Sequence, residues 1–358
     1  MNYKYLHILS HQDTKFYPDF VKMINESKEF NVDEFLFITW YKDVYECIKQ
    51  YKNVLYIDKK NKIYKWLYKS KWIFMHSNFF TKMETILLPK KICKKIIWRT
   101  WGHDIRPLDK EKNILKRFLF KLYVKKVNMF KAIGIANDID AVNVQNVFGY
   151  KLNLYKLNYS YKNNQKEIVE KIKKEGFINK KNEIRILLGH NAGKAENHIQ
   201  NLYRLSRYVN ENIKIFIPLS YSNQDQEYIK KIKSTSIDIF GNDKVEFIEN
   251  FMEYYDYVKL INSMDIAIMD QEFSNGLGNL SLLIYFKKKI FVNKKGNIAQ
   301  SFINKNITPN YADDIGKIKF DRFIKKNFDS RLDEYINQSA LIDKNANINN
   351  LKKIIDAL

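Results

Sequence analysis

The chain has 358 residues and a formal net charge of +22, with hydrophobic residues at 45% of positions and aromatic residues at 15%. A single hydrophobic core stops growing at roughly 250 to 300 residues, so this length predicts two domains, and the apolar content excludes intrinsic disorder. No run of about 18 uncharged apolar residues occurs, which excludes a membrane-spanning helix of ordinary type. The apolar start is interrupted by Lys4, His7 and His11, so we expect no secretory signal and a cytoplasmic protein.

Lysine supplies most of the positive charge, in a sequence also rich in asparagine, isoleucine and tyrosine. This bias is typical of an AT-rich genome as well as of anion binding, so composition leaves open nucleic acid, an anionic membrane or an anionic substrate. Arginine, which nucleic-acid interfaces use for bidentate contacts, is scarce, and this disfavours nucleic acid. Cys47 and Cys93 stand in separate segments and predict neither a disulfide framework nor a zinc site.

Short β-branched and aromatic runs alternate with amphipathic stretches along the chain, which predicts an α/β fold with parallel sheets. The first series of expected strands covers residues 3–9, 34–40, 54–57, 72–76, 96–99 and 132–136. A second series covers residues 184–188, 213–219, 245–248, 265–269 and 289–292, after a polar stretch with a helix at 165–174. We predict two doubly wound, Rossmann-like domains facing across a cleft, at residues 1–160 and 183–340, with a linker at 161–182 and a C-terminal helix at 341–358.

The strand at 265–269 is followed by DQEFSNGLGNLSLLIYF, in which two glycines two residues apart precede an apolar helix. Glycines let an anion approach backbone amides, and a helix start adds unpaired donors and the positive end of the helix dipole. An ordinary strand-to-helix turn has the same spacing and stays open as the alternative. The candidate contacts to a phosphate group in this segment are Ser274, Asn275, Gly276, Leu277, Gly278, Asn279 and Leu280.

A comparable segment, LLGHNAGKAENH, follows the strand at 184–188. It lacks the P-loop pattern, because no Gly-Lys-Ser/Thr stands at the required spacing. His198, on the helix that follows, is more typical of a packed or surface histidine. Two such loops from one sheet favour a diphosphate site more than either does alone, and the candidates in this loop are Gly189, His190, Asn191, Gly193 and Lys194.

The segment WRTWGHD follows the strand at 96–99 and places Asp104 and His103 at its carboxyl end. A transferase must remove a proton from the acceptor hydroxyl, so Asp104 is the candidate general base, assisted by His76 or His103. The alternative is an aspartate that caps the turn before Pro107.

Asp138-Ile139-Asp140 matches the acidic triplet with which many transferases hold a divalent metal, but Asn137-Asp138 is also typical of a helix cap. We therefore expect no bound metal. Residues 113–130, NILKRFLFKLYVKKVNMF, show a basic amphipathic pattern. Such a helix either binds an anionic leaflet or packs on its own sheet as a solvated helix.

Taken together, these segments resemble glycosyltransferase family 56. The resemblance extends over most of the chain and is carried by His7-Ile8-Leu9, His76 with Phe79, Trp98, Trp101-Gly102 with Asp104, Leu188-Gly189 with His198, Pro218, Tyr221, Glu253, Tyr257, Asp265, Gly276, Gly278 and Leu280. Trp-Gly-x-Asp and the Gly-x-Gly helix start are its most specific motifs, and Tyr221, Glu253 and Tyr257 join the donor-site candidates through it.

The resemblance implies a GT-B fold and an enzyme that transfers a 4-acetamido-4,6-dideoxy or fucose-like hexose. It implies a dTDP-sugar donor in the second domain, an undecaprenyl-diphosphate-linked acceptor in the first, no obligatory metal or other cofactor, and work at the inner face of the cytoplasmic membrane. A UDP- or GDP-sugar is the alternative donor. The rival from another class is a nonenzymatic basic protein that binds nucleic acid or anionic membrane.

Overall fold

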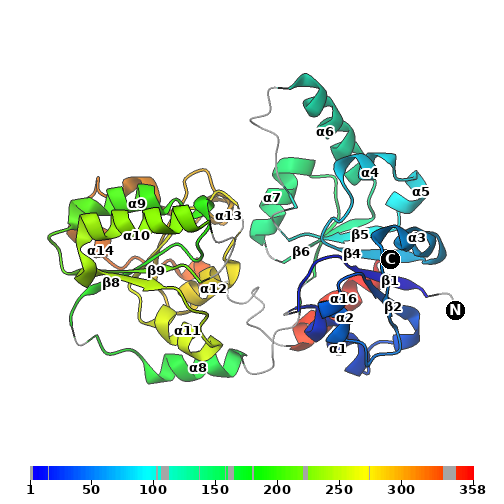
Figure 1. Cartoon of the computed structure of the whole chain (residues 1–358), viewed down its shortest axis with the longest axis horizontal. Coiled ribbons are helices and arrows are strands. Elements are labelled where there is room, and N and C mark those ends of the chain that lie inside the picture. The colour runs from blue at the N-terminus through cyan, green and yellow to red at the C-terminus, as the bar shows by residue number, and fades with distance from the viewer. Residues whose placement is uncertain are drawn as a thin grey trace. The chain divides into compact units, whose positions relative to one another are not determined.

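A computed structural model describes residues 3–14, 16–101, 104–105, 113–136, 138–157, 159, 165–179, 181–220, 225–273, 275–333 and 344–358. The chain divides into two compact units (Figure 1). Unit 1 comprises Met1–Asn163 together with Asp343–Leu358, and unit 2 comprises Asn164–Ile342. Unit 2 is therefore inserted, in sequence, between the body of unit 1 and its last helix.

Unit 1 contains a seven-stranded sheet in the order β3-β2-β1-β4-β5-β6-β7, and all its strand pairs are parallel. Parallel strands need a crossover between neighbours, and helices supply it here. The strands are β1 (Tyr5–Leu9), β2 (Phe35–Thr39), β3 (Val54–Tyr56), β4 (Trp72–His76), β5 (Ile96–Arg99), β6 (Ala132–Ile135) and β7 (Leu154–Lys156). The helices are α1 (Tyr17–Glu26), α2 (Lys42–Glu46), α3 (Tyr64–Lys69), α4 (Lys82–Leu87), α5 (Lys90–Cys93), α6 (Ile114–Val127), α7 (Asp138–Phe148) and α16 (Lys344–Asp356).

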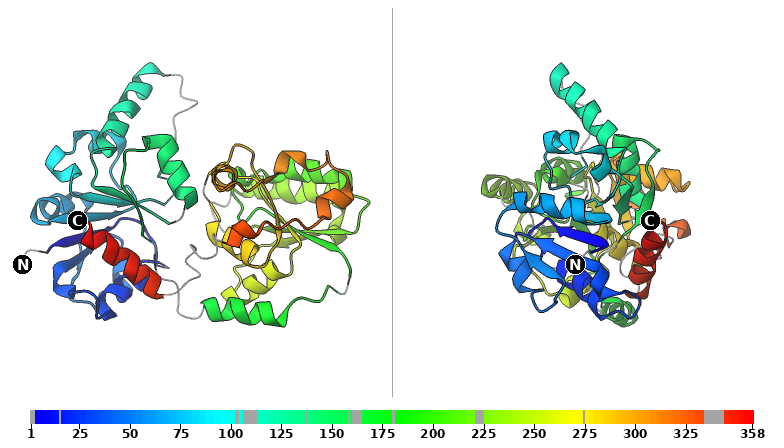
Figure 2. Two further views of the ribbon diagram at one scale, coloured as in Figure 1. Left: turned by 180° about the vertical axis from the view of Figure 1, so that it is seen from behind. Right: turned by 90° about the vertical axis from the view of Figure 1, so that its right-hand side faces the viewer.

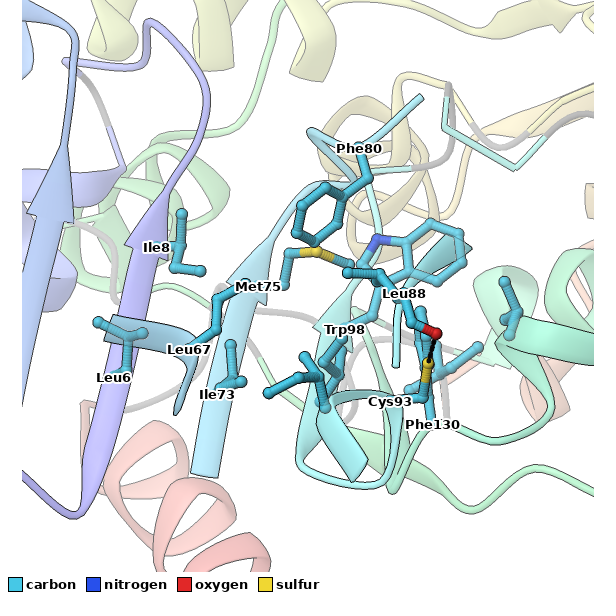
Figure 3. Packing of buried hydrophobic residues seen from close by; sticks show 14 of the residues in the cluster. Leu6, Ile8, Leu67, Ile73, Met75, Phe80, Leu88, Cys93, Trp98 and Phe130 are labelled. Carbon is cyan, nitrogen blue, oxygen red and sulfur yellow. Dashed lines mark hydrogen bonds between the residues drawn. The ribbon is translucent and has the colours of Figure 1, made fainter. Parts of the chain in front are cut away.

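Both faces of this sheet are buried, because side chains alternate between two apolar layers along each strand. Leu6, Ile8 and Trp98 lie in the layer beneath α3, α5, α6 and α7, part of which Figure 3 shows. In that layer, the sulfur of Cys93 lies 3.8 Å from the carbonyl oxygen of Leu88. The intervening residues, Tyr5 and Leu9 among them, face a second layer beneath α1, α2 and α16.

The last helix of the chain, α16, belongs to this second layer. Figure 2 shows this helix beside the body of unit 1. It packs against β7 and α1, and its Leu351 and Ile354 side chains are completely buried. The sequence places residues 161–182 in a linker and 341–358 in a separate helix. In the structure α8 (Gln165–Glu175) lies within the first of these segments and belongs to unit 2, whereas α16 completes unit 1.

Unit 2 contains a six-stranded sheet in the order β10-β9-β8-β11-β12-β13, again with every pair parallel. The strands are β8 (Ile184–Leu188), β9 (Ile213–Pro218), β10 (Val245–Ile248), β11 (Ile266–Met269), β12 (Lys289–Val292) and β13 (Asn310–Tyr311). Helices α9 (His198–Leu205), α10 (Gln226–Phe240) and α14 (Phe320–Ile324) pack on one face through an apolar cluster. The remaining helices of this unit are α8, α11 (Tyr254–Asn262), α12 (Leu277–Tyr285) and α13 (Asn297–Asn304).

The predicted α/β class is confirmed, and all eleven expected strands are present within one or two residues of the expected ends. The short strands β7 and β13, of three and two residues, were not expected. In each sheet the first strand of the unit lies inside the sheet. The next two strands are added on one side of it, and all later strands are added on the other side. The resulting switch points lie between β1 and β4 and between β8 and β11, and open α/β sheets bind ligands at the carboxyl side of such points.

Candidate functional site

The two glycine-containing loops predicted from the sequence follow β8 and β11, the strands on either side of the switch point of unit 2. They meet directly. A β-carbon built on Gly276 would lie 2.7 Å from a carbon of the His190 ring, so the ring fills the space that a side chain would need. The expectation that these loops converge therefore has a structural basis at Gly276 and His190.

His190 is held in place by the loop that carries it. Its Nδ1 lies 3.0 Å from the Oε1 of Glu196, and its Nε2 lies 2.7 Å from the side-chain nitrogen of Asn191. Asn191 also accepts a hydrogen bond from the backbone N–H of Gly193 at 2.6 Å. An amide that donates to Nε2 requires the proton of a neutral imidazole to be on Nδ1, which lies near the Glu196 carboxylate without a hydrogen bond to it. The sequence did not single out Glu196, which is buried at 1% exposure.

Gly189 is a second glycine of this loop whose backbone lies close to a neighbouring side chain. Its φ is +70°, and a β-carbon there would lie 2.7 Å from Nε2 of His198. His198 is fully buried, and burial together with the charge of His190 lowers its pKa to about 4. The expectation that His198 is a packed histidine agrees with this position.

The start of α12 has the features of an anion site. Gly276 is the N-cap residue, has a φ of +65°, and provides no side-chain hydrogen bond to the helix. The first-turn N–H groups of an α-helix have no partner within the helix, so Leu277, Gly278 and Asn279 present theirs at this end. Gly278 is exposed, and a β-carbon there would meet nothing within 4 Å. Leu280 differs from the prediction, because its side chain is buried at 2% exposure and packs in the protein interior.

Other donor-site candidates lie around this helix start. Tyr257 on α11 hydrogen-bonds to Asn279, and burial raises the pKa of the tyrosine. Glu253 is the exposed N-cap residue of α11. Lys194 pairs with Asp225 at 2.7 Å, at the start of α10. The side chain of Lys194 is therefore engaged by a carboxylate in this structure.

A buried polar network fixes the loop after β11. Asp270, at 2% exposure, accepts hydrogen bonds from Asn201 at 3.1 Å, from Arg204 at 2.8 Å and from Asn293 at 2.9 Å. Its backbone carbonyl accepts a further bond from Asn197 at 2.7 Å. These contacts join α9 and the β12 end to the same loop, so they preorganise the position of the α12 helix start. No motif in the sequence indicated this network.

In unit 1, Asp104 lies at the carboxyl side of the sheet, as predicted. Its Oδ2 accepts hydrogen bonds from the backbone N–H of Asn78 at 3.2 Å and from Nε1 of Trp98 at 3.1 Å. Its Oδ1 accepts from the N–H of Trp101 at 2.9 Å. Asp104 is partly exposed, and a carboxylate has about four lone-pair sites. It can therefore accept a further hydrogen bond, for example from a hydroxyl group of a substrate.

His76 does not join Asp104 as a second base. Its side chain is fully buried beneath α1, and both ring nitrogens have partners, with Nε2 3.0 Å from Nδ1 of His7 and Nδ1 2.7 Å from the hydroxyl of Tyr159. Burial and the nearby Arg99 lower its pKa to about 3. The strand end was located correctly, but the alternation along β4 directs this imidazole into the core, where it stabilises the packing of unit 1.

Arg99 is a candidate that the sequence analysis did not identify. It ends β5 at 6% exposure, donates through Nε to the carbonyl of Leu157, and lies over the rings of Trp101 and Tyr159 at 5.7 and 5.2 Å. Within the described ranges no carboxylate lies within ion-pair distance of its guanidinium. The two rings stack on each other, and a cation beside such a pair at a strand end suits an anionic group of a ligand. The only signal in the sequence was its position as the last residue of an otherwise apolar strand.

The acidic triplet of α7 has other partners. Asp138 pairs with Lys156 at 3.6 Å, and Asp140 accepts a hydrogen bond from the N–H of Ala136 at 3.1 Å. Burial raises the pKa of Asp140 to about 6. Across the part of the chain that the structure describes, no group of three His, Cys, Asp or Glu side chains is placed to hold a metal ion. Three predicted site residues, His103, Tyr221 and Ser274, lie outside the described residues.

A family model described as 4-alpha-L-fucosyltransferase, glycosyl transferase group 56, matches residues 8–328. Among solved structures, the chain is similar to a glycosyltransferase from Rickettsia africae ESF-5, at 13% identity over 99% of both chains and a TM-score of 0.62. It is similar to Anabaena HepE in complex with UDP, at 11% identity over 99% of this chain and 100% of that chain and a TM-score of 0.63. A trehalose 6-phosphate synthase from Burkholderia multivorans matches at 7% identity, over 100% of this chain and 98% of that chain, with a TM-score of 0.60. At these identities the likeness concerns the fold, which is the two-domain GT-B arrangement of Rossmann-like units.

Proposed function

Because the chain belongs to the group 56 glycosyltransferase family, we propose that it transfers a 4-acetamido-4,6-dideoxy or fucose-like hexose from a dTDP-sugar to a lipid-linked oligosaccharide. Family membership makes the chain a glycosyltransferase. Our proposal concerns the identity of the donor and of the acceptor. It also includes synthesis of a bacterial surface glycan at the inner face of the cytoplasmic membrane. The family match gives no support to the nonenzymatic alternative.

The observation that carries the donor site is the contact between His190 and Gly276 at the switch point of unit 2. It brings a glycine-containing loop and an uncapped helix start to the same place. In this proposal the amides of the α12 start face the departing nucleoside diphosphate and stabilise the negative charge that develops on it. HepE, which shares the fold, was crystallised with UDP, and this supports a nucleotide-linked donor.

The acceptor half of the proposal concerns unit 1. Asp104 would take the proton of the acceptor hydroxyl as that oxygen attacks the anomeric carbon, while the bond from this carbon to the diphosphate breaks. Arg99 would face an anionic group such as the diphosphate of the lipid carrier. No step of this mechanism requires His76, whose ring nitrogens are both engaged.

Thermal-shift measurements with dTDP, UDP and GDP test the donor. A ligand that binds only the folded protein stabilises it by an amount set by its concentration and affinity. We expect dTDP to raise the melting temperature most, and UDP or GDP in its place would correct the base. If none of the three stabilises the protein, the donor site assigned to unit 2 is wrong.

A further inference from the structure

The first half of α6 exposes large apolar side chains. Ile114 is 83% exposed, Leu115 65% and Phe118 56%. Positions i, i+1 and i+4 lie on one side of a helix, so these three side chains form one apolar strip. Figure 1 shows this end of α6 extending beyond α4, whereas Tyr123 and Val127 at the other end are buried against the sheet.

The neighbouring helix α4 adds two more exposed apolar side chains. Met83 is 48% exposed and Leu87 is 74% exposed, and they stand four residues apart on α4. The two helices pack together, with Nζ of Lys82 5.0 Å from the centre of the Phe120 ring and Nζ of Lys126 2.7 Å from the carbonyl oxygen of Leu88. These contacts place the start of α4 beside the middle of α6, and exposed apolar side chains on two packed helices are typical of an interaction surface.

Within the described helices α4, α5 and α6, the exposed charge is predominantly positive. Helix α6 contains no acidic residue, and the acid of α4, Glu84, is paired with Lys60 at 3.0 Å. The exposed cations of α4, α5 and α6 are Lys82, Lys90, Lys91, Lys116, Arg117, Lys121 and Lys125. Cations beside an exposed apolar strip complement a surface that is negatively charged outside and apolar within, which describes an anionic lipid bilayer.

We propose that this surface, formed by α6 and α4, docks the enzyme on an anionic membrane. Ile114, Leu115 and Phe118 enter the interface between headgroups and acyl chains, and the surrounding lysines contact the lipid phosphates. No helix in the described residues is long and apolar enough to span a bilayer, and α6 lies in the plane of the interface. A nucleic acid would use the cations but gains nothing from the exposed aliphatic side chains of Ile114 and Leu115. The inference rests on the proposed function only in that a lipid-linked acceptor requires such a position.

Vesicle co-sedimentation tests the proposal on the full chain. We expect binding to vesicles of phosphatidylglycerol and phosphatidylcholine, and much weaker binding to phosphatidylcholine alone. The double variant Leu115→Asp with Phe118→Asp should bind the anionic vesicles roughly tenfold or more weakly, because each substitution places a charge in the apolar part of the interface. Ile178→Asp is the matched control, since Ile178 is 80% exposed in unit 2, and it should bind like the unchanged protein.

A charge variant with Lys116→Gln, Arg117→Gln and Lys121→Gln should lose most of the preference for anionic lipid and most of the dependence on salt. Absence of binding to anionic vesicles, or unchanged binding by the double aspartate variant, would overturn the proposal, and so would an equal loss in Ile178→Asp. The nucleoside diphosphate shift is measured on the same variants. Vesicle binding without that shift would refute the donor site while leaving the docking surface in place, and the reverse result would refute only the docking surface.

Discussion

Gly276 satisfies two separate constraints with one residue. The backbone turns there with a φ of +65°, a region that residues with a β-carbon rarely adopt, and the His190 ring occupies the space of a side chain. Gly278, two residues later, satisfies neither constraint, because its β-carbon position is open and exposed. The two glycines of this helix start therefore have different reasons to be glycine, and only Gly276 is required for the fold.

This difference gives a paired prediction. Gly276→Ala should lower the free energy of unfolding by roughly 1 to 3 kcal/mol, through backbone strain and displacement of His190. Gly278→Ala should leave the melting temperature unchanged and reduce the shift produced by dTDP, because the methyl group covers the helix-start amides. Thermal melts with and without dTDP measure both effects. Equal destabilisation by both substitutions would contradict the packing argument, and a full dTDP shift in Gly278→Ala would contradict the approach of a phosphate.

Asp104 organises its loop as well as serving as the candidate base, so its substitution needs a control for structure. In Asp104→Asn one oxygen becomes an NH₂ group that cannot accept from Asn78, Trp98 or Trp101. Trp98→Phe removes one of the same hydrogen bonds but keeps the carboxylate. We expect transfer to a lipid-linked acceptor to fall roughly 10²- to 10⁴-fold in Asp104→Asn and to persist in Trp98→Phe. Near-normal turnover in a folded Asp104→Asn protein would remove this residue from the role of base.

Sequence patterns at the residue scale located strand ends better than they assigned roles. Asp104 and His76 both lie near the carboxyl ends of apolar strands, and both were predicted as site residues. The two residues differ because His76 is still within β4 and its ring contacts Tyr17 and Phe20 of α1, whereas Asp104 lies beyond β5 in the connecting loop. Burial by a helix distant in sequence therefore decides whether a polar side chain at a strand end is accessible.

At the scale of elements, helices and strands with clear periodicity were predictable, whereas the short strands β7 and β13 were not. The pattern of residues 113–130 predicted α6, and the structure places this helix at Ile114–Val127. The strands β7 and β13 are too short for alternation to be visible, and they form because an existing sheet edge supplies their hydrogen-bond partners. The sequence also did not predict which sheet α16 covers, because the apolar side of this helix could pack on any uncovered sheet face.

Helix α16 gives the prediction at this scale. Leu351→Ala should lower the free energy of unfolding of unit 1 by about 2 to 4 kcal/mol, because it opens a cavity against β7 and α1. Lys353→Ala, on the exposed side of the same helix, should have little effect. Hydrogen exchange, measured on individual peptides, shows which of the two units loses stability. A loss of protection in unit 2 with unit 1 unchanged would contradict the packing of α16.

At the scale of the whole molecule, two independent cores account for the length of the chain, and each carries buried histidines. The pKa values of His76 in unit 1 and His198 in unit 2 are lowered to about 3 and about 4 by burial. Because these values lie below the ordinary 6.5, the unfolded chain binds protons first as the pH falls. Buried Asp140 and Asp270 act in the opposite direction, since burial raises their pKa values.

Stability should therefore decrease as the pH falls from about 6.5 toward about 4, by up to about 1.4 kcal/mol per pH unit for each buried histidine. Urea unfolding at several pH values measures this dependence. His198→Gln removes one of the titrating groups and leaves the carboxyl contributions, so its unfolding free energy should change less with pH than that of the unchanged protein. An identical slope in the two proteins would show that His198 does not titrate as the structure implies.

The sequence by itself determined the α/β class, the two doubly wound domains, the family and the two glycine-containing loops, because these depend on local periodicity and on short motifs that few folds use. The tertiary structure decided which of those residues act together. It set His190 against Gly276, enclosed His76, and closed unit 1 with a helix from the far end of the chain. Contacts between segments distant in sequence depend on strand order and on the faces that helices cover, and neither is written in the spacing of nearby residues.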